Sequence, residues 1–199
     1  MKTQTIRSFI AIPLPHTVKL SIDEYLNELK KRQKSGIRWV DAAKMHLTLK
    51  FLGDIDEEQI PAIHQAMQAA ADACPAFSLS LKGLGAFPGS YKPRVIWVGV
   101  KAPAMLQALH QQLAANLCAL GFEAEDRRYS PHLTLGRISR HASEAEVSGV
   151  SKLLHNPPKL HLQGVFVDSL NLYRSDLLPG GSIYTLLQEA KLKENSSQP

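Results

Sequence analysis

Two histidine–threonine pairs are the residues of this sequence whose types and spacing could carry chemistry. The tetrapeptide His-Leu-Thr-Leu begins at His46 and recurs at His132. Each copy lies in a segment with the alternating pattern of a strand, where successive side chains point to opposite faces. His46 and Thr48 are therefore expected on one face of a strand, as are His132 and Thr134. The leucines are expected to anchor the other face.

Two such pairs suit acid–base chemistry at a phosphate. An imidazole titrates near ~6.5, so one histidine can act as general base and the other as general acid. A threonine hydroxyl can donate a hydrogen bond to a non-bridging phosphate oxygen. If the pairs face each other, they can hold a phosphodiester while one imidazole activates water and the other protonates the leaving oxygen. Neither motif brings an acidic residue, so no metal and no other cofactor is expected.

The elements that must position these motifs belong to a chain of ordinary globular composition. Of 199 residues, 44% are hydrophobic and 21% charged, which excludes a disordered chain and a coiled coil. The net charge of +5 is compatible with an anionic partner. Two cysteines outside any CxxC pair indicate a reducing compartment, and no apolar run is long enough for a membrane span. We expect a soluble, cytoplasmic protein, monomeric by default.

Hydrophobic periodicity predicts an α+β protein. Helices are expected over 16–34, 56–72, 102–120 and 143–154. The principal strands are expected over 6–14, 37–40, 44–52, 77–84, 94–100, 129–138, 160–172 and 182–189. Pro131 places the strand with the second motif at a sheet edge or marks its first residue. Because a strand-and-helix pattern surrounds each motif, the sequence predicts a duplicated, bilobal single domain over 1–190, with a polar tail over 191–199.

Several further motifs surround the two pairs. They include Arg-x-Phe-Ile-Ala-Ile-Pro near the start, Ile-Arg-Trp-Val before His46, and Leu-Gly-Ala-Phe-Pro and Val-Ile-Trp-Val-Gly-Val between the pairs. After the second pair comes Ser-Leu-Asn-Leu-Tyr-Arg-Ser-Asp-Leu-Leu-Pro-Gly-Gly-Ser-Ile-Tyr. With the paired HxTx motif, this pattern resembles the 2H phosphoesterase superfamily. Within it, the branch of RNA 2′,3′-cyclic phosphodiesterases, also called 2′-5′ RNA ligases, is the most similar, over residues 6–190.

This resemblance implies two antiparallel sheets with flanking helices and a central cleft that carries one HxTx motif per lobe. It implies hydrolysis of 2′,3′-cyclic phosphates on RNA ends or small nucleotides to 2′-phosphates. By analogy, His46 is the general acid and His132 the general base, while Thr48 and Thr134 hold the phosphate. The sequence is nearly symmetric and does not itself distinguish acid from base. A 2′-5′ RNA ligase, another cyclic phosphodiesterase, or a non-catalytic RNA-end-binding module are the alternatives.

The resemblance also implies a nucleotide-binding role for Phe51 and Arg137, which stand five residues after each histidine. Phe51 would stack on a base, and Arg137 would contact the phosphate or stack as a planar cation. Strict alternation argues against both roles, because it places the two side chains on the leucine face. It also places Lys50 on the histidine face, where a solvated strand residue is expected.

Overall fold

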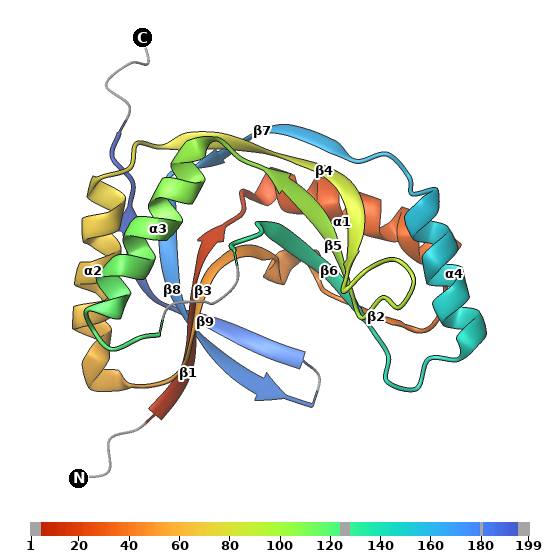
Figure 1. The fold of residues 1–199 in the computed structure, drawn as a ribbon, viewed down its shortest axis with the longest axis horizontal. Coiled ribbons are helices and arrows are strands. Elements are labelled where there is room, and N and C mark those ends of the chain that lie inside the picture. Colours follow the sequence, from red (N-terminus) through yellow and green to blue (C-terminus); the bar gives the residue numbers. More distant parts are fainter. Residues whose placement is uncertain (1–4, 124–127, 180, 195–199) are drawn as a thin grey trace.

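Two antiparallel sheets with helices at their flanks make up the computed structural model, which describes residues 5–123, 128–179 and 181–194 (Figure 1). The predicted α+β architecture with two antiparallel sheets is therefore confirmed. No helix among the described residues combines the length and apolar character needed to cross a membrane.

The first sheet joins strands from both ends of the chain. Its strand order is β3-β1-β8-β9, with every neighbouring pair antiparallel. The strands are β1 (Thr5–Pro13), β3 (His46–Asp56), β8 (Ser169–Leu178) and β9 (Gly181–Lys191). The strand that carries the first motif, β3, thus lies at an edge of this sheet.

The second sheet is built mainly from the middle of the chain. Its order is β2-β6-β5-β4-β7, again antiparallel throughout. The strands are β2 (Ile37–Trp39), β4 (Phe77–Phe87), β5 (Val95–Lys101), β6 (His132–Ile138) and β7 (His161–Val167). The second motif lies on β6, which has a neighbour on each side. Because proline has no N–H to donate, β6 begins directly after Pro131 instead of forming an edge.

In the part of the chain that the structure describes, four α-helices flank the sheets: α1 (His16–Arg32), α2 (Ile60–Asp72), α3 (Ala104–Cys118) and α4 (Glu144–His155). The first three lie within predicted segments, and α4 ends one residue beyond its own. The helix predicted over 56–72 combined two elements, since the 3-10 turn η2 (Glu57–Gln59) precedes α2. A capping box defines the start of α4, where the Ser143 hydroxyl accepts from the Glu146 N–H and the Glu146 carboxylate accepts from the Ser143 N–H.

Within the described residues, the chain passes from one sheet to the other four times: between β1 and β2, β2 and β3, β3 and β4, and β7 and β8. Strand β2 pairs with β6 in the second sheet, but the next strand, β3, belongs to the first. Likewise β7 pairs with β4, whereas β8 pairs with β1. The single strand predicted over 160–172 is therefore wrong: it is two strands in different sheets, interrupted at Asp168. Hydrophobicity alone does not show this break, because both halves are buried against the same core.

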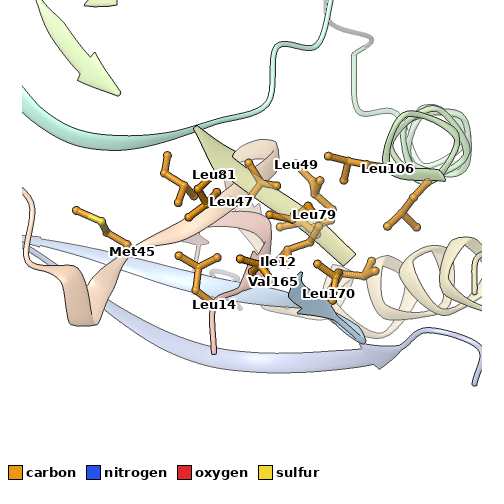
Figure 2. Close-up of a cluster of buried hydrophobic side chains, with 14 of the residues drawn as sticks. Ile12, Leu14, Met45, Leu47, Leu49, Leu79, Leu81, Leu106, Val165 and Leu170 are labelled. Atoms are coloured by element: carbon orange, nitrogen blue, oxygen red, sulfur yellow. The ribbon is translucent and has the colours of Figure 1, made fainter. Parts of the chain in front are cut away.

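One continuous core lies between the sheets and under the helices (Figure 2). The motif leucines belong to it, and Leu47, Leu49, Leu133 and Leu135 are all at most 2% exposed. Figure 2 shows Leu47 and Leu49 among Leu79 and Leu81 of β4 and Ile12 of β1. The predicted leucine anchor is thus confirmed, and it fixes the direction in which the histidines point.

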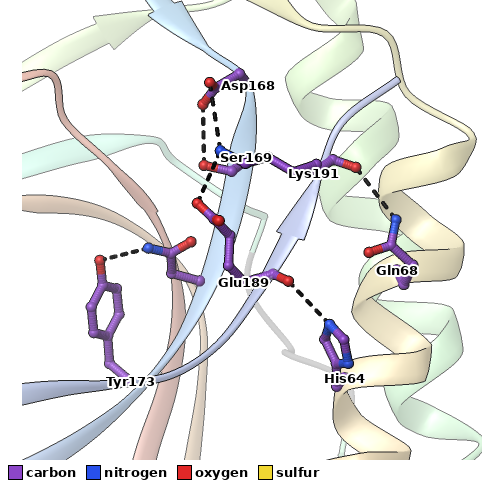
Figure 3. A network of polar contacts seen from close by, with 8 residues as sticks. His64, Gln68, Asp168, Ser169, Tyr173, Glu189 and Lys191 are labelled. Atoms are coloured by element: carbon purple, nitrogen blue, oxygen red, sulfur yellow. Dashed lines mark hydrogen bonds and ion pairs between the residues drawn. The ribbon is translucent and has the colours of Figure 1, made fainter. Parts of the chain in front are cut away.

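Strand β9 is fastened to α2 by polar side chains (Figure 3). His64 and Gln68 bond to the backbone oxygens of Glu189 and Lys191, at 3.0 and 3.4 Å. The backbone N–H of Leu192 donates to Asp168, and that of Lys193 donates to Cys74. Ordered structure thus continues past residue 190, the boundary used for the predicted tail. Of that tail, residues 195–199 lie outside the described part of the chain.

Candidate active site

Both motifs occupy the same position in their strands. His46 is the first residue of β3, and His132 is the first residue of β6. In each strand the histidine and the threonine two residues on are half-buried, while the leucine between them is buried. The shared face predicted for each histidine–threonine pair follows directly from this alternation.

Each imidazole is oriented by a backbone carbonyl two residues before it. His46 Nδ1 lies 2.9 Å from the oxygen of Lys44, and His132 Nδ1 lies 2.7 Å from the oxygen of Ser130. A carbonyl oxygen only accepts hydrogen bonds, so Nδ1 carries the proton in both rings. In both neutral rings Nε2 is therefore the nitrogen without a proton, and it is able to accept one.

Aromatic rings pack around His46. Phe9 of β1 stacks on its imidazole with ring centroids 4.6 Å apart, and Tyr184 of β9 meets it edge-on at 5.1 Å. The pKa of His46 is lowered, chiefly because burial penalises the charged imidazolium. The bond to Lys44 opposes this shift, and the positive charge of Lys19 adds to it. In the free protein, the neutral form of His46 is thus favoured at neutral pH.

His132 has an aromatic setting of its own. Phe87 meets its ring edge-on at 4.9 Å, and the ring of Trp97 lies 6.3 Å away. Trp97 on β5 pairs directly with Thr134, so the two side chains share a face of the sheet. A glycine is required beneath the indole, since a Cβ at Gly85 would lie 2.3 Å from Trp97 carbons.

The two motif strands meet in the middle of the molecule. Strands β3 and β6 contact each other, and they lie side by side in Figure 1. Tyr129, three residues before the second histidine, donates from its hydroxyl to the backbone oxygen of Thr48 at 3.0 Å. The segment that leads into the second motif is thus bonded to the backbone of the first, which brings both motifs to one region.

A bulge in each motif strand reverses the alternation predicted beyond the motifs. Thr48 pairs with Ala11 and Lys50 with Ile10, so Leu49 has no partner of its own on β1. The same irregularity recurs at Leu135, because Thr134 pairs with Trp97 and Gly136 with Ile96. Each extra residue moves the following side chains to the opposite face of the sheet.

The bulges place Phe51 and Arg137 on the histidine faces. Phe51 is 63% exposed, and its ring lies 6.1 Å from that of Phe9, which in turn stacks on His46. Arg137 occupies the matched position on β6 and is also exposed. The objection from strict alternation is therefore wrong, since strict pleating does not extend through a bulge. The bonding roles of these two side chains stay predictions.

The bulge at Leu49 also determines where the Lys50 side chain lies. Its side chain is buried, at 8% exposed, and its Nζ donates to the backbone oxygen of Glu123 at 2.7 Å. The expectation of a solvated residue on the histidine face is wrong, because the bulge turns Lys50 toward the interior. At the matched position Gly136 is also enclosed: a Cβ there would lie 2.8 Å from Ile37.

The sequence reasoning gave no role to Phe9, Lys19, Tyr173 and Tyr184, all of which lie around His46. Phe9, Tyr173 and Tyr184 belong to motifs that carry the resemblance, but their sequence shows only that they are aromatic. They reach His46 because β1, β8 and β9 assemble beside β3, and such pairings between distant segments have no local pattern. Among residues 5–123, 128–179 and 181–194, no three histidine, cysteine or acidic side chains are grouped as metal ligands.

Comparison with known proteins gives consistent results. The family model described as LigT like Phosphoesterase matches the chain twice, over residues 12–97 and 98–184. An RNA 2′,3′-cyclic phosphodiesterase of Thermotoga maritima is 35% identical over 188 residues, which are 94% of this chain and 96% of that protein. The double match supports the duplication inferred from the repeated motif.

Solved structures of similar fold extend over nearly the whole chain. A Thermus thermophilus protein superposes with a TM-score of 0.74 at 28% identity, covering 94% of this chain and 98% of that one. E. coli LigT complexed with 3′-AMP superposes with a TM-score of 0.73 at 26% identity, covering 95% and 99%.

Proposed function

The chain belongs to the LigT-like phosphoesterase family, and we propose that it hydrolyses 2′,3′-cyclic phosphates at RNA ends or on small nucleotides. The observation that carries the proposal is the matched pair of imidazoles. Each is fixed through Nδ1 to a backbone carbonyl, leaves Nε2 for the reactants, and shares its strand face with a threonine hydroxyl. The relatives' names and the 3′-AMP complex of E. coli LigT support a nucleotide substrate.

The proposed reaction uses one imidazole on each side of the phosphorus. His132 Nε2 takes a proton from water, and the water oxygen forms a new bond to phosphorus. The bond between phosphorus and the 3′-oxygen breaks, and His46 Nε2 gives that oxygen its proton. The products are a 2′-phosphate and a free 3′-hydroxyl, and proton exchange with solvent restores the two imidazoles. Thr48 and Thr134 hold the non-bridging oxygens through hydrogen bonds that strengthen as negative charge develops.

The lowered pKa of His46 bears on its role as the acid. In the free protein its burial favours the neutral ring, whereas an acid must begin protonated. A bound phosphate supplies a negative charge beside the imidazole, and an opposite charge within a few ångströms raises the pKa of a histidine. Substrate binding therefore favours the protonated form of His46, which can then give its proton to the leaving oxygen. Phe51 and Arg137, on the same faces, are proposed to contact the nucleotide.

No metal is proposed in this reaction, because the two imidazoles and two hydroxyls provide both proton transfer and charge stabilisation. The deciding experiment incubates an oligoribonucleotide that ends in a 2′,3′-cyclic phosphate with the protein in excess EDTA. A mass gain of one water and a 2′-phosphate are expected. A 3′-phosphate would reverse the leaving group, and activity that returns only with added zinc or magnesium would contradict metal independence.

A 2′-5′ RNA ligase is the second candidate. In that reaction a 5′-hydroxyl replaces water as the group that bonds to phosphorus, and the bond from phosphorus to the 3′-oxygen breaks in the same way. It is tested in the same reaction by adding an RNA with a free 5′-hydroxyl. A joined 2′-5′ product that accumulates above the hydrolysed product would favour the ligase.

A further inference from the structure

A separate cavity of about 230 Å³ adjoins His46, and Thr48, His132 and Thr134 do not line it. Its wall is formed by the end of β1, the start of α1, the segment that leads into β3, and strands β8 and β9. The lining side chains include Lys19, Lys44, Met45, Tyr173, Ile183 and Tyr184. Because His46 is itself a lining residue, a ligand in this cavity would lie next to a phosphate held by the motifs.

Two positively charged side chains line this cavity. Lys19 and Lys44 each bring an ammonium group, and among the described lining residues there is no aspartate or glutamate. Lys19 is also close enough to His46 for its charge to lower the pKa of the imidazole. Two ammonium groups with no carboxylate beside them suit an anion.

Both ammonium groups are held in place by the backbone. Lys19 Nζ donates to the oxygen of Ala43 at 2.8 Å, and Lys44 Nζ donates to the oxygen of Ser182 at 3.1 Å. An ammonium has three N–H donors, so each lysine keeps two for a ligand. Because these anchors limit the side chains' freedom beforehand, less conformational entropy is lost when an anion binds.

Tyr173 adds a third donor to the same cavity. Its hydroxyl oxygen accepts a hydrogen bond from the buried amide Nδ2 of Asn171 at 3.0 Å (Figure 3). With the oxygen engaged in this way, the hydroxyl hydrogen is oriented to donate elsewhere. The remaining walls, from Met45, Ile183 and the Tyr184 ring, are apolar and suit a sugar.

We propose that this cavity binds the phosphate on the 5′ side of the reacting nucleotide, so that the enzyme prefers RNA ends to simple nucleoside cyclic phosphates. This inference rests on the proposed function and narrows its substrate class. In an RNA chain, the 5′-phosphate is the nearest phosphate to the terminal cyclic phosphate. It would occupy the Lys19–Lys44 cavity while the cyclic phosphate lies between the two HxTx motifs.

The test compares three substrates at one ionic strength: adenosine 2′,3′-cyclic phosphate, the same compound with a 5′-phosphate, and a dinucleotide that ends in a 2′,3′-cyclic phosphate. The expected kcat/KM is about tenfold or more higher for the second and third, since charge-assisted contacts to a phosphate are strong. Lys19→Met and Lys44→Met should each reduce this preference, and the double variant should abolish it. Lys31→Met removes the same charge from an exposed site on α1 and should leave the preference unchanged.

A binding measurement separates this inference from the proposed function. By calorimetry, adenosine 2′,5′-bisphosphate should bind about tenfold more tightly than adenosine 2′-phosphate, and the double variant should lose the difference. If nothing is hydrolysed but this difference holds, the cavity assignment stands and the hydrolase proposal falls. Equal affinities in the wild type, a preference that survives in the double variant, or a cavity filled only by inorganic phosphate would overturn the assignment.

Discussion

Replacing either motif histidine with asparagine isolates the proton-transfer step from the fold. The asparagine amide nitrogen can take the place of Nδ1 and donate to the same backbone oxygen, that of Lys44 for His46 and that of Ser130 for His132. What the substitution removes is Nε2, the atom proposed to exchange protons with the reactants. The orienting bond is thus retained, while the acid–base group is lost.

The expected loss follows from what general acid–base catalysis contributes. One positioned acid or base is worth about 10²–10⁴ in rate, so each variant should lose about 2.7–5.4 kcal/mol of transition-state stabilisation. Because the two imidazoles act in one step, the double variant should lose much less than the product of the two single losses. The assay is kcat/KM on a cyclic-phosphate-terminated RNA, with circular dichroism melts to check the fold.

His155 provides a matched control for this experiment. Its Nδ1 also lies close to a backbone oxygen, that of Ser151 at 2.7 Å, but on helix α4. His155→Asn should therefore change kcat/KM by less than about twofold. If His46→Asn or His132→Asn kept more than about a tenth of wild-type activity while the control behaved as expected, the two-histidine reasoning would be refuted.

Three more outcomes test the site and its supports. Burial lowers the pKa of His46, so below the ordinary value of 6.5 the unfolded chain binds a proton at this residue more readily than the native chain does. The free energy of unfolding, measured by urea titration, should therefore fall as the pH drops, and it should fall less steeply in His46→Asn. Phe51→Ala should cost under about 1 kcal/mol in the same titrations but raise the KM for RNA ends, whereas Leu49→Ala should cost about 2–5 kcal/mol; a large loss of stability at Phe51 would mean that it is a core residue. Gly136→Ala places a Cβ 2.8 Å from Ile37 and should destabilise by about 1–3 kcal/mol, so an unchanged melting temperature would contradict the close packing described here.

Much of the candidate site was predictable because its signals are local. The spacing within each motif predicts which side chains share a face, and the leucines between them predict the buried side. The Ser143–Glu146 pair, with its two residues three positions apart, similarly marks the start of α4. These features depend on neighbours along the chain, which periodicity and capping rules describe well.

The features that could not be predicted depend on strands that meet only in the folded protein. A bulge at Leu49 or Leu135 is defined by a partner strand, so alternation alone misplaced Phe51, Arg137 and Lys50. The chain breaks at Asp168 because β7 belongs to the second sheet and β8 to the first. The hydrophobic pattern nevertheless continues across this position.

The crossing of the chain between the sheets has a consequence during synthesis. Strand β1 is made early, but its neighbour β8 follows only after the whole second sheet has emerged. A nascent chain that already contains the first motif therefore lacks the tyrosines of β8 and β9 that pack near His46. Although the two motifs look like copies of one unit, the two halves of the chain cannot fold one after the other during translation. The surroundings of the first motif are complete only after residue 184 has been translated, so the first sheet forms late. A chain cut between the repeats would lack β8 and would leave one edge of β1 unpaired.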